Sequence, residues 1–192
     1  MEDAHNGPPV VVASEKIYGG RIIEVVVDTV REDGQTYVRE VVRHNGGAGV
    51  VACFADGSVA LVRQYRHPTR SYVLELPAGR IEAGEGPDVC AARELEEELG
   101  VVAGRMELLS EFYTTPGFCA ERLWVYLATD LRETARRHEE DEIIEVVRLP
   151  FARALGMVAS GEIEDAKTII GLLVAARRLG VPAGGAAEAE AS

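Results

Sequence analysis

The stretch GRIEAGEGPDVCAARELEEELGV, from Gly79 to Val101, decides how this sequence folds. Pro87 suits the first turn of a helix, where its missing N–H has no partner to lose, and Gly100 suits the residue that ends one. We therefore expect a helix between these two residues, preceded by a strand that reads SYVLELPAG. Carboxylates crowd into the second half of this helix, and their placement bears on function.

Three glutamates of the predicted helix share one face. At about 100° per residue, Glu94, Glu97 and Glu98 lie together, whereas Glu96 points away and is expected to be solvated. The apolar stripe expected to face the core consists of Ala91, Ala92, Leu95 and Leu99.

This acidic face carries a cost that a metal ion would remove. Like charges three or four residues apart destabilise a helix by about 0.2–0.5 kcal/mol per pair, and the helix dipole disfavours anions near the C-terminus. Grouped carboxylate oxygens suit hard cations such as Mg²⁺ or Mn²⁺. Helix geometry by itself leaves two interpretations open, a solvated acidic face and a metal site.

The spacing of residues extends the pattern beyond one helix. Gly79 is followed at fixed intervals by Glu85, by Arg93 with Glu94, by Glu97 with Glu98, and by Gly100 with Val101. This pattern resembles the Nudix box at every defining position. The resemblance implies an α+β Nudix fold, an α/β/α sandwich with a mixed β-sheet, and hydrolysis of a nucleoside diphosphate linked to another group.

The resemblance also implies a metal-binding set. Glu94 and Glu98 would be the main ligands, Glu97 would contribute directly or through water, and the carbonyl of Ala78 would be a further ligand. Glu97 and Glu98 would also take part in catalysis. The implied cofactor is Mg²⁺, with Mn²⁺ as the alternative.

The other box residues would support this set. By resemblance, Arg93 would pair with Glu85 and orient the carboxylates. Gly79 and Gly100 would permit tight turns at the two ends of the motif.

Two segments outside the box narrow the resemblance to the ADP-ribose pyrophosphatase subgroup. TTPGFCAE lies where that subgroup has a substrate-lining segment, so Pro116, Gly117 and Glu121 would bind substrate. VRQYRHPTR brings Arg66 before the box, at the position of an arginine that contacts substrate. Arginine forks recognise phosphate oxygens well. An ordinary Pro-Gly turn and an edge-strand arginine are the structural alternatives.

The segment HEEDEIIEVV matches an acidic loop of the same subgroup, which supplies a carboxylate that binds metal or activates water. Glu140 aligns best, with Glu139 and Glu142 as alternatives. A solvated charged loop remains the structural alternative.

The N-terminal segment, residues 10–47, contains valine-rich runs around the turn EDGQ and predicts antiparallel strands. In the subgroup that this chain resembles, a small N-terminal sheet is exchanged across a two-fold dimer. The resemblance then implies a homodimer in which Tyr18 stacks on adenine and Arg39 contacts the substrate.

Composition excludes several classes of protein. The formal net charge of −12 disfavours nucleic acid and anionic membranes as partners. Three cysteines without C-x-x-C spacing predict neither disulfides nor a zinc site and fit a reducing, cytoplasmic setting. The N-terminus lacks the pattern of a signal peptide.

We expect a flexible start at residues 1–9, the N-terminal sheet at 10–47, a Nudix hydrolase domain at 48–181 and a disordered tail at 182–192. The predicted reaction is Mg²⁺-dependent hydrolysis of ADP-ribose to AMP and ribose 5-phosphate. Alternatives are another nucleoside diphosphate sugar or a dinucleotide as substrate, or a non-catalytic ADP-ribose sensor. A complete set of box carboxylates argues against a sensor.

Overall fold

The computed structural model describes residues 7–134 and 143–182. Most of the predicted flexible start, nearly all of the predicted disordered tail, and the acidic-loop candidates Glu139, Glu140 and Glu142 lie outside the described residues. The chain divides into two compact units. The first unit comprises Met1–Gly46 with Tyr113–Arg122, and the second comprises Gly47–Phe112 with Leu123–Ser192.

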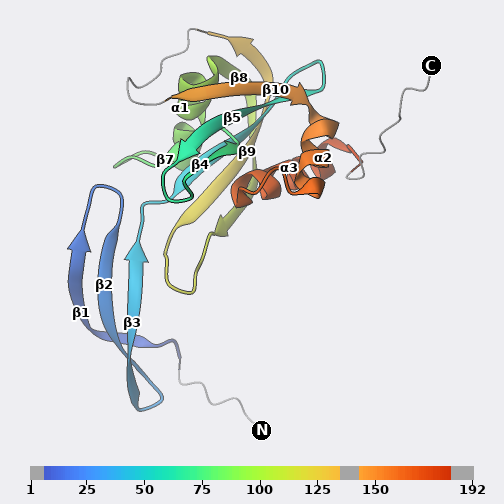
Figure 1. The fold of residues 1–192 in the computed structure, drawn as a ribbon. Coiled ribbons are helices and arrows are strands. Elements are labelled where there is room, and N and C mark those ends of the chain that lie inside the picture. Colours follow the sequence, from blue (N-terminus) through green and yellow to red (C-terminus); the bar gives the residue numbers. More distant parts are fainter. Residues whose placement is uncertain (1–6, 135–142, 183–192) are drawn as a thin grey trace. The chain divides into compact units, whose positions relative to one another are not determined.

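The first unit is a three-stranded antiparallel sheet in the order β1-β2-β3 (Figure 1). Its strands are β1 (Val10–Gly19), β2 (Glu24–Glu32) and β3 (Gln35–Arg43). Asp33 and Gly34 turn the chain between β2 and β3 with φ of 46° and 79°. Two successive positive φ values are typical of the tight turns that join hairpin strands, so the hairpin predicted at EDGQ is confirmed.

The segment 113–122 joins this sheet through β3. The backbone N–H of Val42 donates to the carbonyl of Phe118 at 2.8 Å, and the N–H of Ala120 donates to the carbonyl of Val42 at 2.9 Å. Val42 thus forms a parallel bridge with Cys119. This pairing fixes the Pro-Gly loop of TTPGFCAE relative to the N-terminal strands.

The second unit is built on a mixed seven-stranded sheet with the order β10-β5-β4-β9-β8, in which β6 pairs with β5 and β7 with β4. β4 runs parallel to β9 and antiparallel to β5 and β7. The strands are β4 (Gly47–Cys53), β5 (Ser58–Arg66), β6 (Ser71–Glu75), β7 (Ala78–Arg80), β8 (Val101–Tyr113), β9 (Arg122–Glu133) and β10 (Ile144–Pro150).

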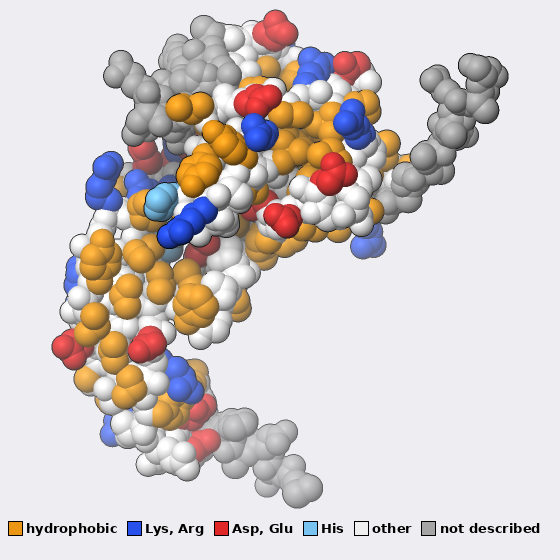
Figure 2. All heavy atoms as spheres, viewed as in Figure 1, with side chains coloured by type: hydrophobic (Ala, Val, Ile, Leu, Met, Phe, Trp, Pro, Cys, Tyr) orange, Lys and Arg blue, Asp and Glu red, His pale blue; other side chains and the backbone are white. Residues whose placement is uncertain are grey.

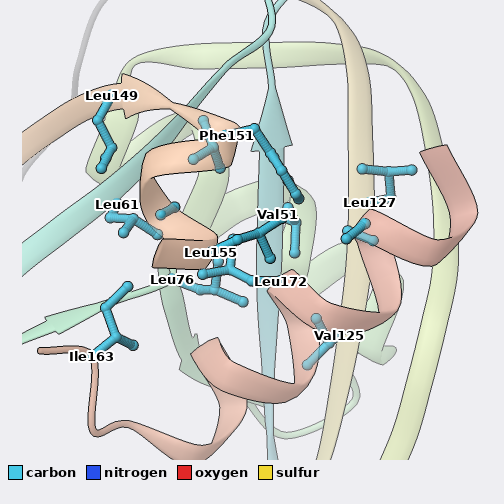
Figure 3. Packing of buried hydrophobic residues seen from close by; sticks show 14 residues of the cluster. Val51, Leu61, Leu76, Val125, Leu127, Leu149, Phe151, Leu155, Ile163 and Leu172 are labelled. Carbon is cyan, nitrogen blue, oxygen red and sulfur yellow. The ribbon is translucent and has the colours of Figure 1, made fainter. Parts of the chain in front are cut away.

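Helices cover both faces of this sheet. Alternate residues of β4 point to opposite sides: Val51 packs in a cluster with α2 (Phe151–Ser160) and α3 (Ala166–Leu179), whereas Val50 packs in a cluster with α1 (Pro87–Leu99). Figure 3 shows the first cluster, in which Leu155 and Leu172 lie against Val51. A strand buried on both faces reads as a continuous apolar run, as GAGVVAC does. The predicted α+β sandwich with a mixed sheet is confirmed.

The tight contact between α3 and the sheet gives a first prediction. A Cβ added at Gly171 would lie 2.7 Å from Leu76 Cδ1 and 3.0 Å from Val125 Cγ1. We expect Gly171→Ala to lower the free energy of unfolding by about 1–3 kcal/mol through overpacking. Gly156 of α2 has nothing within 4 Å of such a Cβ, so Gly156→Ala is the matched control and should stabilise by about 0.5–1 kcal/mol. Urea unfolding of both variants checks this; equal effects would contradict it.

Candidate active site

Two carboxylates of helix α1 are buried on the side of the helix that faces the core. Glu94 is 8% exposed and Glu98 is 4% exposed, on the same side as Cys90, Ala91 and Leu95. The sequence predicted an acidic face beside a separate apolar stripe, and this was wrong in one respect: Ala92, expected in the core, is exposed. The buried arc is centred near Glu94 and Glu98, because β4 and β7 pack against this side of the helix.

Arg93 lies at the centre of the box and contacts three carboxylates. Its Nε and Nη2 donate to Glu85 at 2.9 and 3.1 Å, and its Nη1 donates to Glu94 at 2.6 Å and to Glu97 at 3.0 Å. The hydrogen bonds to Glu85 are the main cause that raises the pKa of Arg93, and the same bonds lower the pKa of Glu85. The structure thus brings Arg93 and Glu85 together as the box pattern implied.

Glu98 is hydrogen-bonded to β7, the strand that contains the first box residue, Gly79. One of its carboxylate oxygens accepts the backbone N–H of Ala78 at 3.1 Å. Ala78 is the residue whose carbonyl was expected among the metal ligands. A buried carboxylate is costly unless it is hydrogen-bonded or paired with a cation, so the burial of Glu94 and Glu98 requires such partners.

The two box glycines serve different purposes. Gly100 has φ of 67° and ends α1 in the left-handed conformation, where its N–H bonds the carbonyl of Glu96. Gly79 instead lies in strand β7 and its φ is not positive. A Cβ at Gly79 would lie 1.7 Å from Glu94 Oε1, so this position needs glycine to leave room for the carboxylate, and the expected tight turn is not its role.

The oxygen donors of the box fit a hard divalent ion by type and by burial. Within residues 7–134 and 143–182, however, no three histidine, cysteine, aspartate or glutamate side chains are grouped closely enough to hold a metal. The Arg93 guanidinium stands between Glu85, Glu94 and Glu97 and supplies the positive charge. The room beside the Gly79 Cα is filled by the Glu94 carboxylate itself.

Arg66 lies on the side of the sheet that α1 covers. Val62, on its face of β5, pairs with Glu75 of β6, and Ala60 pairs with Ala52 of the α1 cluster. The guanidinium of Arg66 is already paired: its Nε and Nη2 donate to Glu75 at 2.6 and 3.1 Å.

Sequence reasoning missed Glu75 and Lys167. Lys167, in the first turn of α3, also donates to Glu75. The one signal for Glu75 was a carboxylate inside the apolar run VLELP; for Lys167 there was none.

The remaining predicted residues belong to the first unit. Tyr18 is 55% exposed, and Arg39 lies over the ring of Tyr37 at 4.2 Å. Tyr18 pairs with Val25 of β2, and Arg39 pairs with Asp28 of the same strand. Val25 and Asp28 are three residues apart on β2, so their side chains point to opposite faces. Tyr18 and Arg39 therefore lie on opposite faces of this sheet, and a ligand on one face would contact one of them.

Glu121, Pro116 and Gly117 lie in the segment that pairs with β3. Glu121 accepts the hydroxyl of Thr114 at 2.9 Å and lies 3.4 Å from Nδ1 of His44. A Cβ at Gly117 would meet nothing within 4 Å. Their predicted roles in substrate binding stay predictions.

The second unit thus has a mixed sheet between helices, and the buried Glu94 and Glu98 of α1 contact β7, the strand that contains Gly79. This is the arrangement of the class of Nudix domains. The family model described as NUDIX domain matches residues 43–170, and the chain belongs to this family. It is 40% identical over 160 residues to an ADP-ribose pyrophosphatase of Bacillus subtilis (strain 168), which covers 82% of this chain and 86% of that protein.

Two further comparisons agree. An ADP-ribose pyrophosphatase of Mycobacterium tuberculosis (strain ATCC 25618 / H37Rv) is 41% identical over 166 residues, covering 84% of this chain and 80% of that protein. A crystal structure titled ADP compounds hydrolase shares the fold, with a TM-score of 0.79 at 24% identity over 92% of this chain and 98% of that one. Nudix hydrolases typically need a divalent metal ion. In the described part of the chain, none of the helices has the length and apolar character to span a membrane.

Proposed function

We propose that this protein is a Mg²⁺-dependent pyrophosphohydrolase that cleaves ADP-ribose to AMP and ribose 5-phosphate. The observation that carries the proposal is the burial of Glu94 and Glu98 on the core side of α1, against the strand that holds Gly79. Similarity to two ADP-ribose pyrophosphatases over more than four-fifths of the chain favours this substrate.

The box residues would hold the ion. Glu94, Glu98 and Glu97 offer carboxylates and Ala78 a carbonyl, an all-oxygen set that suits Mg²⁺ and also Mn²⁺, and we propose Mg²⁺ as the ion. A bound ion would neutralise pyrophosphate charge and make water a better nucleophile. Glu94 and Glu97 would exchange their bonds with Arg93 for the ion, while the two bonds of Arg93 to Glu85 keep the guanidinium in place.

Glu97, Glu98 and Glu140 are the proposed groups that orient or deprotonate water. Glu140 lies outside the described residues. The next strand in the sequence, β10, starts at Ile144, opposite Gln64, and Gln64 is two residues from Arg66 on β5. The first residue of β10 therefore lies at the end of β5 that carries the proposed phosphate-binding arginine.

Arg66 would bind pyrophosphate oxygens and gives a second prediction. Arg66→Ala should raise KM for ADP-ribose by roughly tenfold while changing kcat less, because a charge-assisted contact to substrate is lost. Metal affinity should stay near that of the wild type. Steady-state kinetics at saturating Mg²⁺ measures this, and an unchanged KM would remove Arg66 from the phosphate site.

The first unit would bind the nucleoside part within a homodimer. Apolar side chains gather over the strands of this unit in Figure 2. The exposed apolar residues of these strands include Val10, Ile17, Tyr18 and Val38, all more than half exposed. Asp28 Oδ1 is buried yet has no hydrogen-bond partner among the described residues. Both features suit a sheet that packs against a second copy, with an exchange of the N-terminal sheet as the proposed arrangement.

In that dimer Tyr18, Arg39, Pro116, Gly117 and Glu121 would contact substrate. Because Tyr18 and Arg39 lie on opposite faces of the sheet, we propose that they serve different positions of the substrate or the two different sites. Residues 10–47 would form the exchanged segment and 48–181 the hydrolase domain. Three cysteines, each a free thiol, support a cytoplasmic setting.

The substrate is tested by a panel of ADP-ribose, GDP-mannose, flavin adenine dinucleotide and NADH, with phosphate release through a coupled phosphatase. We expect the highest kcat/KM for ADP-ribose. A higher value for another compound would assign a different substrate to the same site. Binding of ADP-ribose without phosphate release, at any Mg²⁺ or Mn²⁺ concentration, would identify a sensor instead.

A further inference from the structure

Glu75 is a buried carboxylate that no part of the box accounts for. It is the last residue of β6, is 3% exposed, and forms ion pairs with cationic side chains from two different elements. Arg66 of β5 donates two hydrogen bonds to Glu75, from Nε and from Nη2. Lys167 of α3 donates to Oε2, the oxygen that Nη2 also contacts. Burial alone would raise the pKa of Glu75, but the bonds and charges of Arg66 and Lys167 outweigh it and hold that pKa below its usual value.

The start of α3 supplies further contacts that hold Lys167 and the end of β6 in place. Asp165 caps the helix by accepting the N–H of Thr168 at 3.0 Å, and it also lies 3.1 Å from Nζ of Lys167. The hydroxyl of Thr168 accepts the backbone N–H of Leu76 at 2.8 Å. Leu76, the residue after Glu75, is thus hydrogen-bonded to α3. Two residues further along the chain, Ala78 is hydrogen-bonded to Glu98.

This network decides where Arg66 points. Two of its three nitrogens are committed to Glu75, and within the described residues Nη1 donates no hydrogen bond. The charge of Glu98 acts on the same guanidinium. An arginine fixed in this way presents one edge toward an anion without first having to be ordered, which lowers the entropic cost of binding.

We propose that Glu75 is a positioning residue for Arg66 and that Lys167, from α3, fixes Glu75 in turn. The inference rests on the proposed function, since it assigns the phosphate-binding role to Arg66. The competing explanation is an ion cluster that only stabilises the fold. The two differ in whether Glu75 affects KM, and whether it does so only through Arg66.

A double-mutant cycle separates these explanations. KM and kcat for ADP-ribose are measured at saturating Mg²⁺ for wild type, Glu75→Gln, Arg66→Ala and the double variant. We expect Glu75→Gln to raise KM about tenfold and to add less than about twofold in the Arg66→Ala background, because residues that act through one contact are not additive. Additive effects, or an unchanged KM in Glu75→Gln, would overturn the proposal.

Lys167 provides an independent test if Glu75→Gln folds poorly. Lys167→Met should raise KM by about threefold, and Lys167→Arg should restore it by keeping the cation. The matched control is Arg178→Met, which removes another α3 ion pair, with Glu107, and should leave KM unchanged. Equal KM values in Lys167→Met and wild type would overturn the role of Lys167. No hydrolysis by the wild type would instead refute the proposed function.

Discussion

Glu98→Gln is expected to lower kcat for ADP-ribose by about a thousandfold or more while the fold stays intact. Metal-supplied charge stabilisation contributes several kcal/mol to such reactions, and about 1.4 kcal/mol corresponds to tenfold in rate. Glutamine keeps the shape of the side chain and an oxygen that can accept the N–H of Ala78. The loss should therefore fall on metal binding and catalysis. Kinetics over a Mg²⁺ titration measures it.

Glu96→Gln is the matched control for this experiment. Glu96 lies on the same helix, outside the set that the structure buries, and the hydrogen bond that ends α1 uses its backbone carbonyl. We expect near-normal kcat in this variant and similar melting temperatures for both variants. Near-normal activity of Glu98→Gln at saturating Mg²⁺ would show that Glu98 is not a metal ligand.

Gly79→Ala is expected to cost both stability and activity. The new Cβ would lie 1.7 Å from Glu94 Oε1 and 2.1 Å from its Cδ, so the carboxylate must move. The overpacking should lower the free energy of unfolding by about 1–3 kcal/mol. Displacing a metal ligand should lower kcat by roughly a hundredfold or more, since supporting mutations cost about 10–100-fold even without touching the ligands.

A second substitution separates the two effects. In Gly79→Ala/Glu94→Ala the clash disappears, so the stability cost of Gly79→Ala should vanish in this background, whereas activity should remain lost. Chemical denaturation and single-turnover kinetics provide both readings. A full stability cost of Gly79→Ala without the Glu94 carboxylate would show that backbone conformation, and not the carboxylate, demands glycine at this position.

Local signals predicted the elements that hold the site. The Pro87 and Gly100 boundaries of α1 follow from the missing N–H of proline and the left-handed end of the helix, with φ of 67° at Gly100. The turn at Asp33 and Gly34 follows from their tolerance of positive φ. These features depend on a few neighbouring residues, so one sequence suffices to predict them.

Tertiary packing set the features that the sequence did not predict. An angle on a helical wheel does not say where the core lies, and Ala92 is exposed because β4 and β7 approach α1 from the side of Glu94 and Glu98. Arg66 is held by Glu75 of the neighbouring strand β6, and Glu75 in turn accepts from Lys167 of α3, 92 residues further along the chain. Such long-range pairs leave no spacing signal.

The register of the N-terminal sheet is a further case. Tyr18 and Arg39 both suit a substrate site by residue type, but strand pairing puts them on opposite faces. The pairing of β1 with β2 shifts between Lys16 and Tyr18, which changes the face that the following residues occupy. Alternation counted along the sequence does not reveal such a shift.

The most direct test of the account is product analysis of ADP-ribose incubated with the purified wild-type protein. ³¹P NMR or ion-pair chromatography would follow the reaction in EDTA and after Mg²⁺ is restored. We expect AMP and ribose 5-phosphate in equal amounts, only with the divalent ion present. Intact ADP-ribose at all Mg²⁺ and Mn²⁺ concentrations, or the same rate in EDTA, would contradict it.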